Sequence, residues 1–258
     1  MFVDSHCHLN YPGLFEEQDA ALVRARGAGV TAMLNIATRA SEWDAIVATA
    51  DAHSDVWATV GVHPHDADAH QDVTAEILIA RAAHPRVIGI GETGLDYHYD
   101  HSERARQRDN FRIHIAAARA SGLPIIVHTR DAEDDTAAIL HEEMEKGVFT
   151  GVIHCFTASA AFAEVALKLG LYISFSGIVT FRNAHDLQEI ARSVPMDRLL
   201  IETDAPFLAP VPHRGRSCEP AFVADTATSL AALRGEGIID FARATTDNFH
   251  RLFAKASR

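Results

Sequence analysis

The feature that most constrains the fold is a repeated alternation of short apolar runs with longer segments of helical spacing. Eight runs rich in Val, Ile and Leu each lead into polar or turn residues, and helix-like segments, most of them ending near a Gly, lie between them. Strands that are buried on both faces and alternate with helices are typical of a parallel sheet. The runs cover residues 2–3 (leading into 4–8), 31–37, 55–62, 86–91, 123–128, 150–156, 171–177 and 198–203.

Eight such units, followed by two further helices at 219–234 and 240–254, predict an α/β fold: a single (β/α)8 TIM barrel with additional C-terminal helices. The alternative is an open, doubly wound sheet. A length of 258 residues also permits two small domains, but no Pro/Ser-rich linker, low-complexity stretch or charge block interrupts the alternation. We therefore expect residues 1–258 to form one domain.

The composition limits which binding partners and which cellular compartment we expect for the protein. A net charge of −12 argues against a protein that binds nucleic acid or anionic lipid through a broad basic surface. The three cysteines form no Cys-x-x-Cys pair, which predicts reduced thiols and a cytoplasmic location. No apolar run approaches about 18 residues and no signal-peptide pattern opens the chain, so we expect neither membrane contact nor processing. Nothing indicates an obligate protein partner.

The 16 histidines are the unusual element of the composition, and several fall where the predicted strands end. Active-site residues of barrels lie at these carboxyl ends and in the loops that follow. Strand side chains alternate, so the residues of each His-x-His pair point the same way. The expected residues at this rim are His6 and His8 (first strand), His63 and His65 (third), Glu92 (following the fourth), His128 (fifth), His154 (sixth) and Asp204 (eighth).

Imidazole nitrogens and carboxylate oxygens together suit zinc, manganese and related ions, and the absence of convergent thiolates argues against a closed structural zinc site. We therefore predict two divalent ions (Zn, Mg or Mn) with Glu92 bridging them, and Asp204 accepting the proton of a metal-activated water. His63 and His65 are expected as ligands or substrate contacts, or alternatively as caps of the barrel rim. The predicted metal ligands are His6, His8, Glu92, His128, His154 and Asp204.

Arginines near this rim suggest an anionic substrate, because a guanidinium clamps phosphate through two hydrogen bonds. Arg130 and Arg216 are the predicted contacts, with surface ion pairs as the alternative, and Arg216 lies in a long loop at 205–218. We expect Cys7 and Cys155 to point toward the helix layer and Cys218 to be exposed. The histidines expected to be solvated are His53, His84, His101, His114, His141 and His250.

Eight motifs in order along the chain carry a resemblance to a known family: DSHCHLN (4–10), GVHPH (61–65), GETGLDYHYD (91–100), PIIVHTRDA (124–132), GVIHCFTAS (151–159), SFSGIVTF (174–181), IETDAPFLAPVPHRGR (201–216) and TTDNFHRLF (245–253). The chain resembles the TatD family of metal-dependent deoxyribonucleases, within the amidohydrolase superfamily. The resemblance implies that one ion lies among His6, His8, Glu92 and Asp204 and the other among Glu92, His128 and His154, with His63 beside the scissile phosphate.

Two departures from the family pattern concern the phosphate side of the site. Ala158 stands where the family usually has Gly, and the chain reads Ser217–Cys218–Glu219–Pro220 where the family usually has Lys or Arg followed by Asn-Glu-Pro. Neither departure affects a predicted metal ligand, but both leave the substrate preference open.

The favoured function is metal-dependent phosphodiester hydrolysis, as an exonuclease acting on DNA. The acidic net charge is compatible with DNA if two ions and a few arginines form a local positive rim, which predicts single-stranded substrates or strand ends. The first alternative is a deacylase or amidohydrolase that uses the same ions on a carbonyl group. The second is a metal-binding regulatory protein without turnover.

Overall fold

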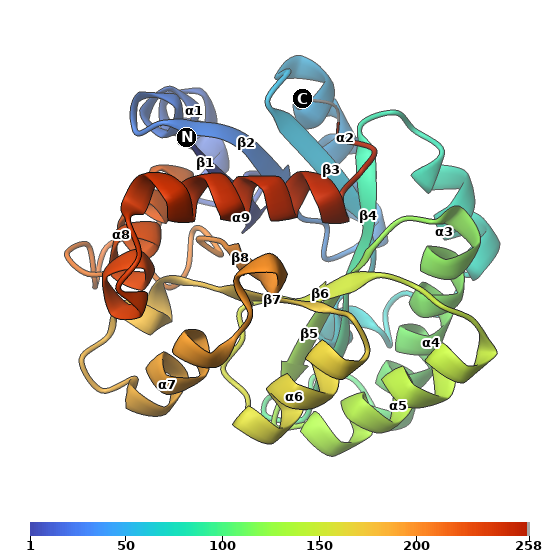
Figure 1. Ribbon diagram of the computed structural model, residues 1–258. Coiled ribbons are helices and arrows are strands. Elements are labelled where there is room, and N and C mark those ends of the chain that lie inside the picture. Colours follow the sequence, from blue (N-terminus) through green and yellow to red (C-terminus); the bar gives the residue numbers. More distant parts are fainter. Residues whose placement is uncertain (257–258) are drawn as a thin grey trace.

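The structure, a computed structural model, describes residues 1–256 of the chain. Within that range, eight parallel strands pair in sequence order to form one sheet (Figure 1). A bridge between Cys7 and Ala205 brings the first and last strands together, so the sheet curls into a barrel. The strands are β1 (Phe2–Cys7), β2 (Val30–Asn35), β3 (Val56–Val60), β4 (Val87–Asp96), β5 (Ile125–Arg130), β6 (Gly151–Ile153), β7 (Tyr172–Phe175) and β8 (Leu199–Ile201).

Helices connect the strands and surround the barrel, which confirms the expected (β/α)8 fold and excludes the open sheet (Figure 1). No helix within residues 1–256 is long and apolar enough to cross a membrane. The α-helices are α1 (Gln18–Gly27), α2 (Trp43–Ala52), α3 (Ala75–Ala82), α4 (Arg104–Ser121), α5 (Glu133–Lys146), α6 (Ala160–Lys168), α7 (His185–Ser193), α8 (Val223–Arg234) and α9 (Ile238–Leu252).

The last helix, α9, closes one end of the barrel rather than joining the outer ring. Figure 1 shows it lying across the strands, and Phe249 and Phe253 pack with strand residues such as Leu34 and Leu200 in one apolar cluster. The side chain of Asn248 donates to the backbone at Leu199, where β8 begins. Because α9 packs over the amino-terminal end of the barrel, the carboxyl-terminal end of the strands is left open for a site.

Polar contacts between β1 and the residues that follow β8 hold the two chain segments together. The carboxylate of Asp4 accepts hydrogen bonds from the backbone N–H of Thr203 at 2.9 Å and from its hydroxyl at 2.6 Å. One residue further on, the backbone N–H of Asp204 donates to the carbonyl of His6 at 2.9 Å. These contacts place the side chains of His6 and Asp204 next to each other at the rim.

Strand β4 is longer than the expected run at 86–91, so Glu92 lies within the strand and not after it. The extension pairs with β5 as far as Asp96 opposite Arg130, after a register shift between Ile90 and Thr93. Gly94 permits this close pairing: its φ is +135°, and an added Cβ would lie 2.0 Å from the carbonyl oxygen of His128. The apolar pattern predicted an end at residue 91 because the polar residues that follow are not typical of a buried strand.

Two predictions of solvent exposure were wrong. Cys218 is buried, because its backbone N–H donates to the carbonyl of Pro206 and folds the loop back onto the barrel. His114 is fully buried on the inner face of α4, where its Nε2 accepts the backbone N–H of Val62 at 2.9 Å and its Nδ1 donates to the carbonyl of Asn110 at 2.8 Å. A neutral imidazole satisfies both bonds, which explains why a polar residue is tolerated there.

Burial lowers the pKa of His114 from 6.5 to about 4. Because this folded-state pKa lies below the unfolded value, the unfolded chain binds more protons between these limits, and stability falls as pH drops through them. We expect His114 to make unfolding easier by about 2 kcal/mol at pH 5 relative to pH 7. Urea unfolding of wild type and His114→Gln checks this, because glutamine stays neutral. A stability difference between the two proteins that does not change with pH would contradict the prediction.

Candidate metal centre

The carboxyl ends of the strands surround a cavity of about 660 Å³. Its lining comes from loops that follow different strands, so distant parts of the sequence meet at one point. His6 is fully buried and is not among the described residues that line the cavity. Of the predicted site residues, the lining includes His8, His63, His65, Glu92, His128, Arg130, His154 and Asp204.

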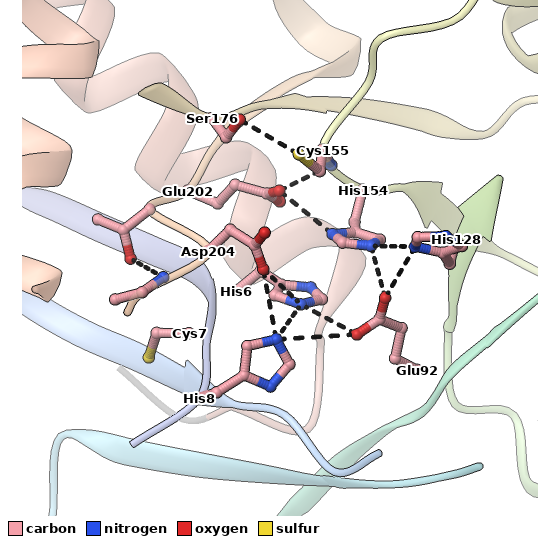
Figure 2. Close-up of polar contacts among 12 residues, drawn as sticks. His6, Cys7, His8, Glu92, His128, His154, Cys155, Ser176, Glu202 and Asp204 are labelled. Atoms are coloured by element: carbon pink, nitrogen blue, oxygen red, sulfur yellow. Dashed lines mark hydrogen bonds and ion pairs between the residues drawn. The ribbon is translucent and has the colours of Figure 1, made fainter. Parts of the chain in front are cut away.

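Three side chains, those of His6, His8 and Asp204, converge on one side of Glu92 (Figure 2). Nε2 of His6 lies 3.2 Å from Nε2 of His8, 3.3 Å from Oε2 of Glu92 and 3.5 Å from Oδ1 of Asp204. Nε2 of His8 lies 3.3 Å from the same Asp204 oxygen. Ligand atoms bound about 2.0–2.2 Å from one ion are roughly 3–4 Å apart, so this spacing fits a divalent cation.

The other oxygen of Glu92 faces a second group of imidazoles (Figure 2). Its Oε1 lies 2.7 Å from Nε2 of His154, 3.2 Å from Nδ1 of His128 and 3.4 Å from Nε2 of His63. Burial disfavours the ionised form of Glu92, but the surrounding histidines hold the pKa of this carboxyl well below its usual range. Glu92 therefore lies, as a carboxylate, between two groups of nitrogen donors.

The hydrogen bonds behind two of these imidazoles show which nitrogens are free to bind metal. Nε2 of His128 contacts Oδ2 of Asp96 at 3.0 Å, and Nδ1 of His154 contacts Oε1 of Glu202 at 3.3 Å. A carboxylate accepts an N–H, so in the neutral imidazoles the opposite nitrogens carry lone pairs that face Oε1 of Glu92. Lone pairs directed at a carboxylate repel it unless a cation lies between them, so this donor set fits a bound metal ion.

His63 differs from these two imidazoles. Its Nδ1 accepts the backbone N–H of His65 at 3.1 Å, so in the neutral ring the proton is on Nε2, facing Glu92. Burial lowers the pKa of His63 to about 4, which keeps the ring neutral at pH 7. His65 turns away from Glu92, with its Nε2 2.9 Å from Oδ2 of Asp96. This geometry favours hydrogen-bond donation by His63 over metal ligation.

The two predicted arginines lie in different environments. Arg130 ends β5, lines the cavity and lies over the ring of Tyr99, 4.8 Å from its centroid. Arg216 is exposed on the loop at 205–218 and is not among the described residues that line the cavity. The structure therefore brings Arg130, but not Arg216, to the cavity that the predicted metal ligands line.

Sequence reasoning missed the carboxylates of Asp96 and Glu202. Both are buried and both contact imidazoles of the cluster. The signal was present in the spacing, since Asp96 is four residues after Glu92 and Glu202 is two before Asp204. Residues at even spacings in an extended segment tend to point to the same face, and both pairs lie in or just after a predicted strand.

The expected orientation of Cys155 was wrong, whereas Cys7 packs in the apolar layer as predicted. Cys155 lines the cavity, and its Sγ lies 3.2 Å from the hydroxyl of Ser176 (Figure 2). Its φ of +42° lies in the left-handed region, which breaks strand alternation after β6. Burial raises the pKa of this thiol well above its ordinary value, so it is protonated at neutral pH.

The carboxyl ends of the barrel strands carry imidazoles and carboxylates around one buried glutamate. This arrangement is characteristic of the class of metal-dependent hydrolases. A family model described as TatD related DNase matches residues 3–254. The uncharacterized metal-dependent hydrolase YcfH of Escherichia coli K12 is 46% identical over 254 residues, which cover 97% of this chain and 95% of that protein. The chain belongs to the TatD family.

Two further relatives extend the comparison to structure and activity. The crystal structure of YjjV, a TatD homolog from Escherichia coli K12, matches with a TM-score of 0.90 and 31% identity over 98% of each chain. A protein of Klebsiella pneumoniae named 3′-5′ ssDNA/RNA exonuclease TatD is 36% identical over 242 residues, 92% of each chain. The resemblance found from the sequence motifs is thus confirmed.

We expect Asp96→Asn to weaken metal binding by about 10- to 100-fold. The asparagine oxygen can replace the oxygen that accepts the backbone N–H groups of His98 and Tyr99, and the amide nitrogen then faces Nε2 of His128. An N–H in that place forces His128 to carry its proton on Nδ1, where the lone pair is needed. Competition with a chromogenic chelator measures the loss.

The matched control for this substitution is Asp131→Asn. Asp131 contacts His98 at 2.9 Å on the same rim but touches none of the predicted ligands. Its substitution should leave metal affinity at the wild-type value. Equal metal affinities for Asp96→Asn and wild type would show that Asp96 does not orient His128.

Proposed function

We propose that this hydrolase is a deoxyribonuclease that removes nucleotides from the ends of single-stranded DNA. The observation that carries the proposal is that Arg130 and the Nε2–H of His63 face the same cavity as the metal cluster. A guanidinium and a neutral N–H donor beside bound cations form a site for a phosphodiester. The exonuclease name of the Klebsiella relative supports the same substrate class.

Two divalent ions (Zn, Mg or Mn) are the proposed cofactors. His6, His8, Glu92 and Asp204 would hold one ion, and Glu92, His128 and His154 the other. Bound there, they supply Lewis acidity, which acidifies a water molecule and neutralises negative charge on a phosphoryl oxygen.

Asp204 is the proposed general base for that water. It lines the cavity, and although burial opposes ionisation, the hydrogen bond from His8 and the nearby imidazoles lower the pKa of its carboxyl. An ionised carboxylate at the rim can accept a proton. The backbone of Asp204 has φ +57°, in the left-handed region, which Asp adopts more readily than most residues. His63 would donate its Nε2–H to a phosphate oxygen, and His65 would contact the substrate beside it.

The size of the cavity and the charge of the protein favour the end of a DNA strand over a duplex as the substrate. The cavity of about 660 Å³ is within the range of small-ligand sites. The chain carries a net charge of −12, so attraction to the polyanion must be local to the ions and to the arginines that line the cavity, among them Arg130. We also propose a cytoplasmic location, which suits the free cysteines Cys7, Cys155 and Cys218.

Metal-reconstituted protein should shorten single-stranded DNA labelled at one end, and the Glu92→Ala/Asp204→Ala double variant should not. The double variant lacks the carboxylate shared by both groups of donors and the proposed base, so we expect at least a 1,000-fold lower rate, or about 4 kcal/mol in the barrier. Gel analysis of strands labelled at either end also reports the polarity. Digestion by the double variant at the wild-type rate would refute the site assignment.

Replacement of Arg130 separates phosphodiester hydrolysis from the alternative, deacylation at the same metal cluster. Arg130→Ala should lower cleavage of single-stranded DNA by about 10- to 100-fold, because a charge-assisted contact to phosphate is lost. The control, Arg216→Ala, should have a smaller effect because this residue lies away from the cavity lining. Rates on DNA and on an acyl ester decide the matter: ester hydrolysis without DNA cleavage would favour a deacylase.

A further inference from the structure

Exposed aromatic side chains gather at the cavity. The exposed Phe and Tyr residues among residues 1–256 are Tyr11, Phe15, Tyr99 and Phe207, and all of these except Phe15 line the cavity. Large apolar rings are normally buried, and those that remain exposed around a polar site commonly contact a ligand. Metal binding by the predicted ligands does not explain why these rings are exposed at the cavity.

Tyr11 and Phe207 form a pair on one side of the rim. They follow β1 and β8, which are neighbours in the closed barrel, and their ring centroids lie 5.0 Å apart at 71° between the planes. The two residues are 46% and 42% exposed. Because an edge-to-face pair covers only part of each ring, a flat apolar ligand can still stack on it.

Backbone hydrogen bonds connect this pair directly to two of the predicted metal ligands. The N–H of Tyr11 donates to the carbonyl of His8 at 3.0 Å, and the N–H of Phe207 donates to the carbonyl of Asp204 at 2.9 Å. The Phe207 ring lies 6.2 Å from the ring of His8. The pair is therefore held at a defined position beside the reacting centre.

The opposite side of the rim has a different character. Tyr99 lies parallel to His101, with 5.5 Å between centroids and 2° between planes, and its ring also supports the guanidinium of Arg130. These residues belong to the ends of β4 and β5, half a turn around the barrel from β1 and β8. The ring of Tyr99 is thus engaged with Arg130 and His101, whereas the rings of Tyr11 and Phe207 pack on each other.

We propose that Tyr11 and Phe207 form a stacking site for the nucleobase of a strand end. This inference rests on the proposed function, since the base belongs to the same substrate whose phosphates would contact the ions and Arg130. Stacking on an aromatic ring requires an unstacked base, which single strands supply and duplexes do not. Every base has a flat face, so the site accepts any sequence.

The test measures binding of phosphorothioate-linked single-stranded oligonucleotides to metal-loaded protein by fluorescence anisotropy. Each oligonucleotide carries either a normal or an abasic residue at the 3′ or the 5′ end, so that phosphates are matched and only the base differs. Wild type should bind the base-bearing strand about 5- to 100-fold more tightly at the end that enters the cavity. Phe207→Ala and Tyr11→Ala should reduce that preference toward unity.

Two further variants separate stacking from loss of structure. Phe207→Trp should keep or increase the preference for the base, because its ring presents a larger face. Phe15→Ala removes another exposed ring, which lies outside the cavity lining, and this variant should bind like wild type.

The outcomes distinguish this inference from the proposed function. Wild type that cleaves DNA but binds abasic and normal ends equally would overturn the stacking site alone. Failure of wild type to bind or cleave any oligonucleotide would overturn both. A preference for the base that persists in a Tyr11→Ala/Phe207→Ala double variant would also overturn the stacking site.

Discussion

The buried carboxylate of Glu92 is the constraint on which the rest of the site depends. One of its oxygens faces His6 and His8, and the other faces His128 and His154. Such a carboxylate is tolerated in the interior only with compensating positive charge, from protonated imidazoles or from metal ions. The extension of β4 past residue 91 carries Glu92 to this position, so the local pairing of β4 with β5 determines the geometry of the whole cluster.

A second layer of carboxylates gives the imidazoles their direction. Asp96 contacts His128 and Glu202 contacts His154, each through the ring nitrogen that points away from Glu92. Without these partners, either nitrogen of each ring could carry the proton. The lone pairs would then not always face Glu92 and the proposed metal ions. The arrangement explains why the site contains more buried carboxylates than metal ligation alone requires.

Binding of a polyanion by an acidic protein requires that attraction be confined to a small area. In the proposed site, the bound ions and Arg130 would attract phosphate within one cavity, while Tyr11 and Phe207 would supply apolar contact. Under the proposed function, such a site would select for strand ends, because only the end of a flexible chain could enter the cavity without bringing more phosphates against the acidic surface.

The sequence by itself determined the barrel and the rim positions of His6, His8, His128, His154 and Asp204, because alternation of apolar runs and placement of polar residues at strand ends are local properties. It could not determine the length of β4, the burial of His114 and Cys218, or the orientation of Cys155. These depend on contacts between distant segments, such as Gly94 against His128. The pairing of Asp96 and Glu202 with their histidines, and of Tyr11 with Phe207, was likewise decided only by closure of the barrel, which brings separate strand ends into contact.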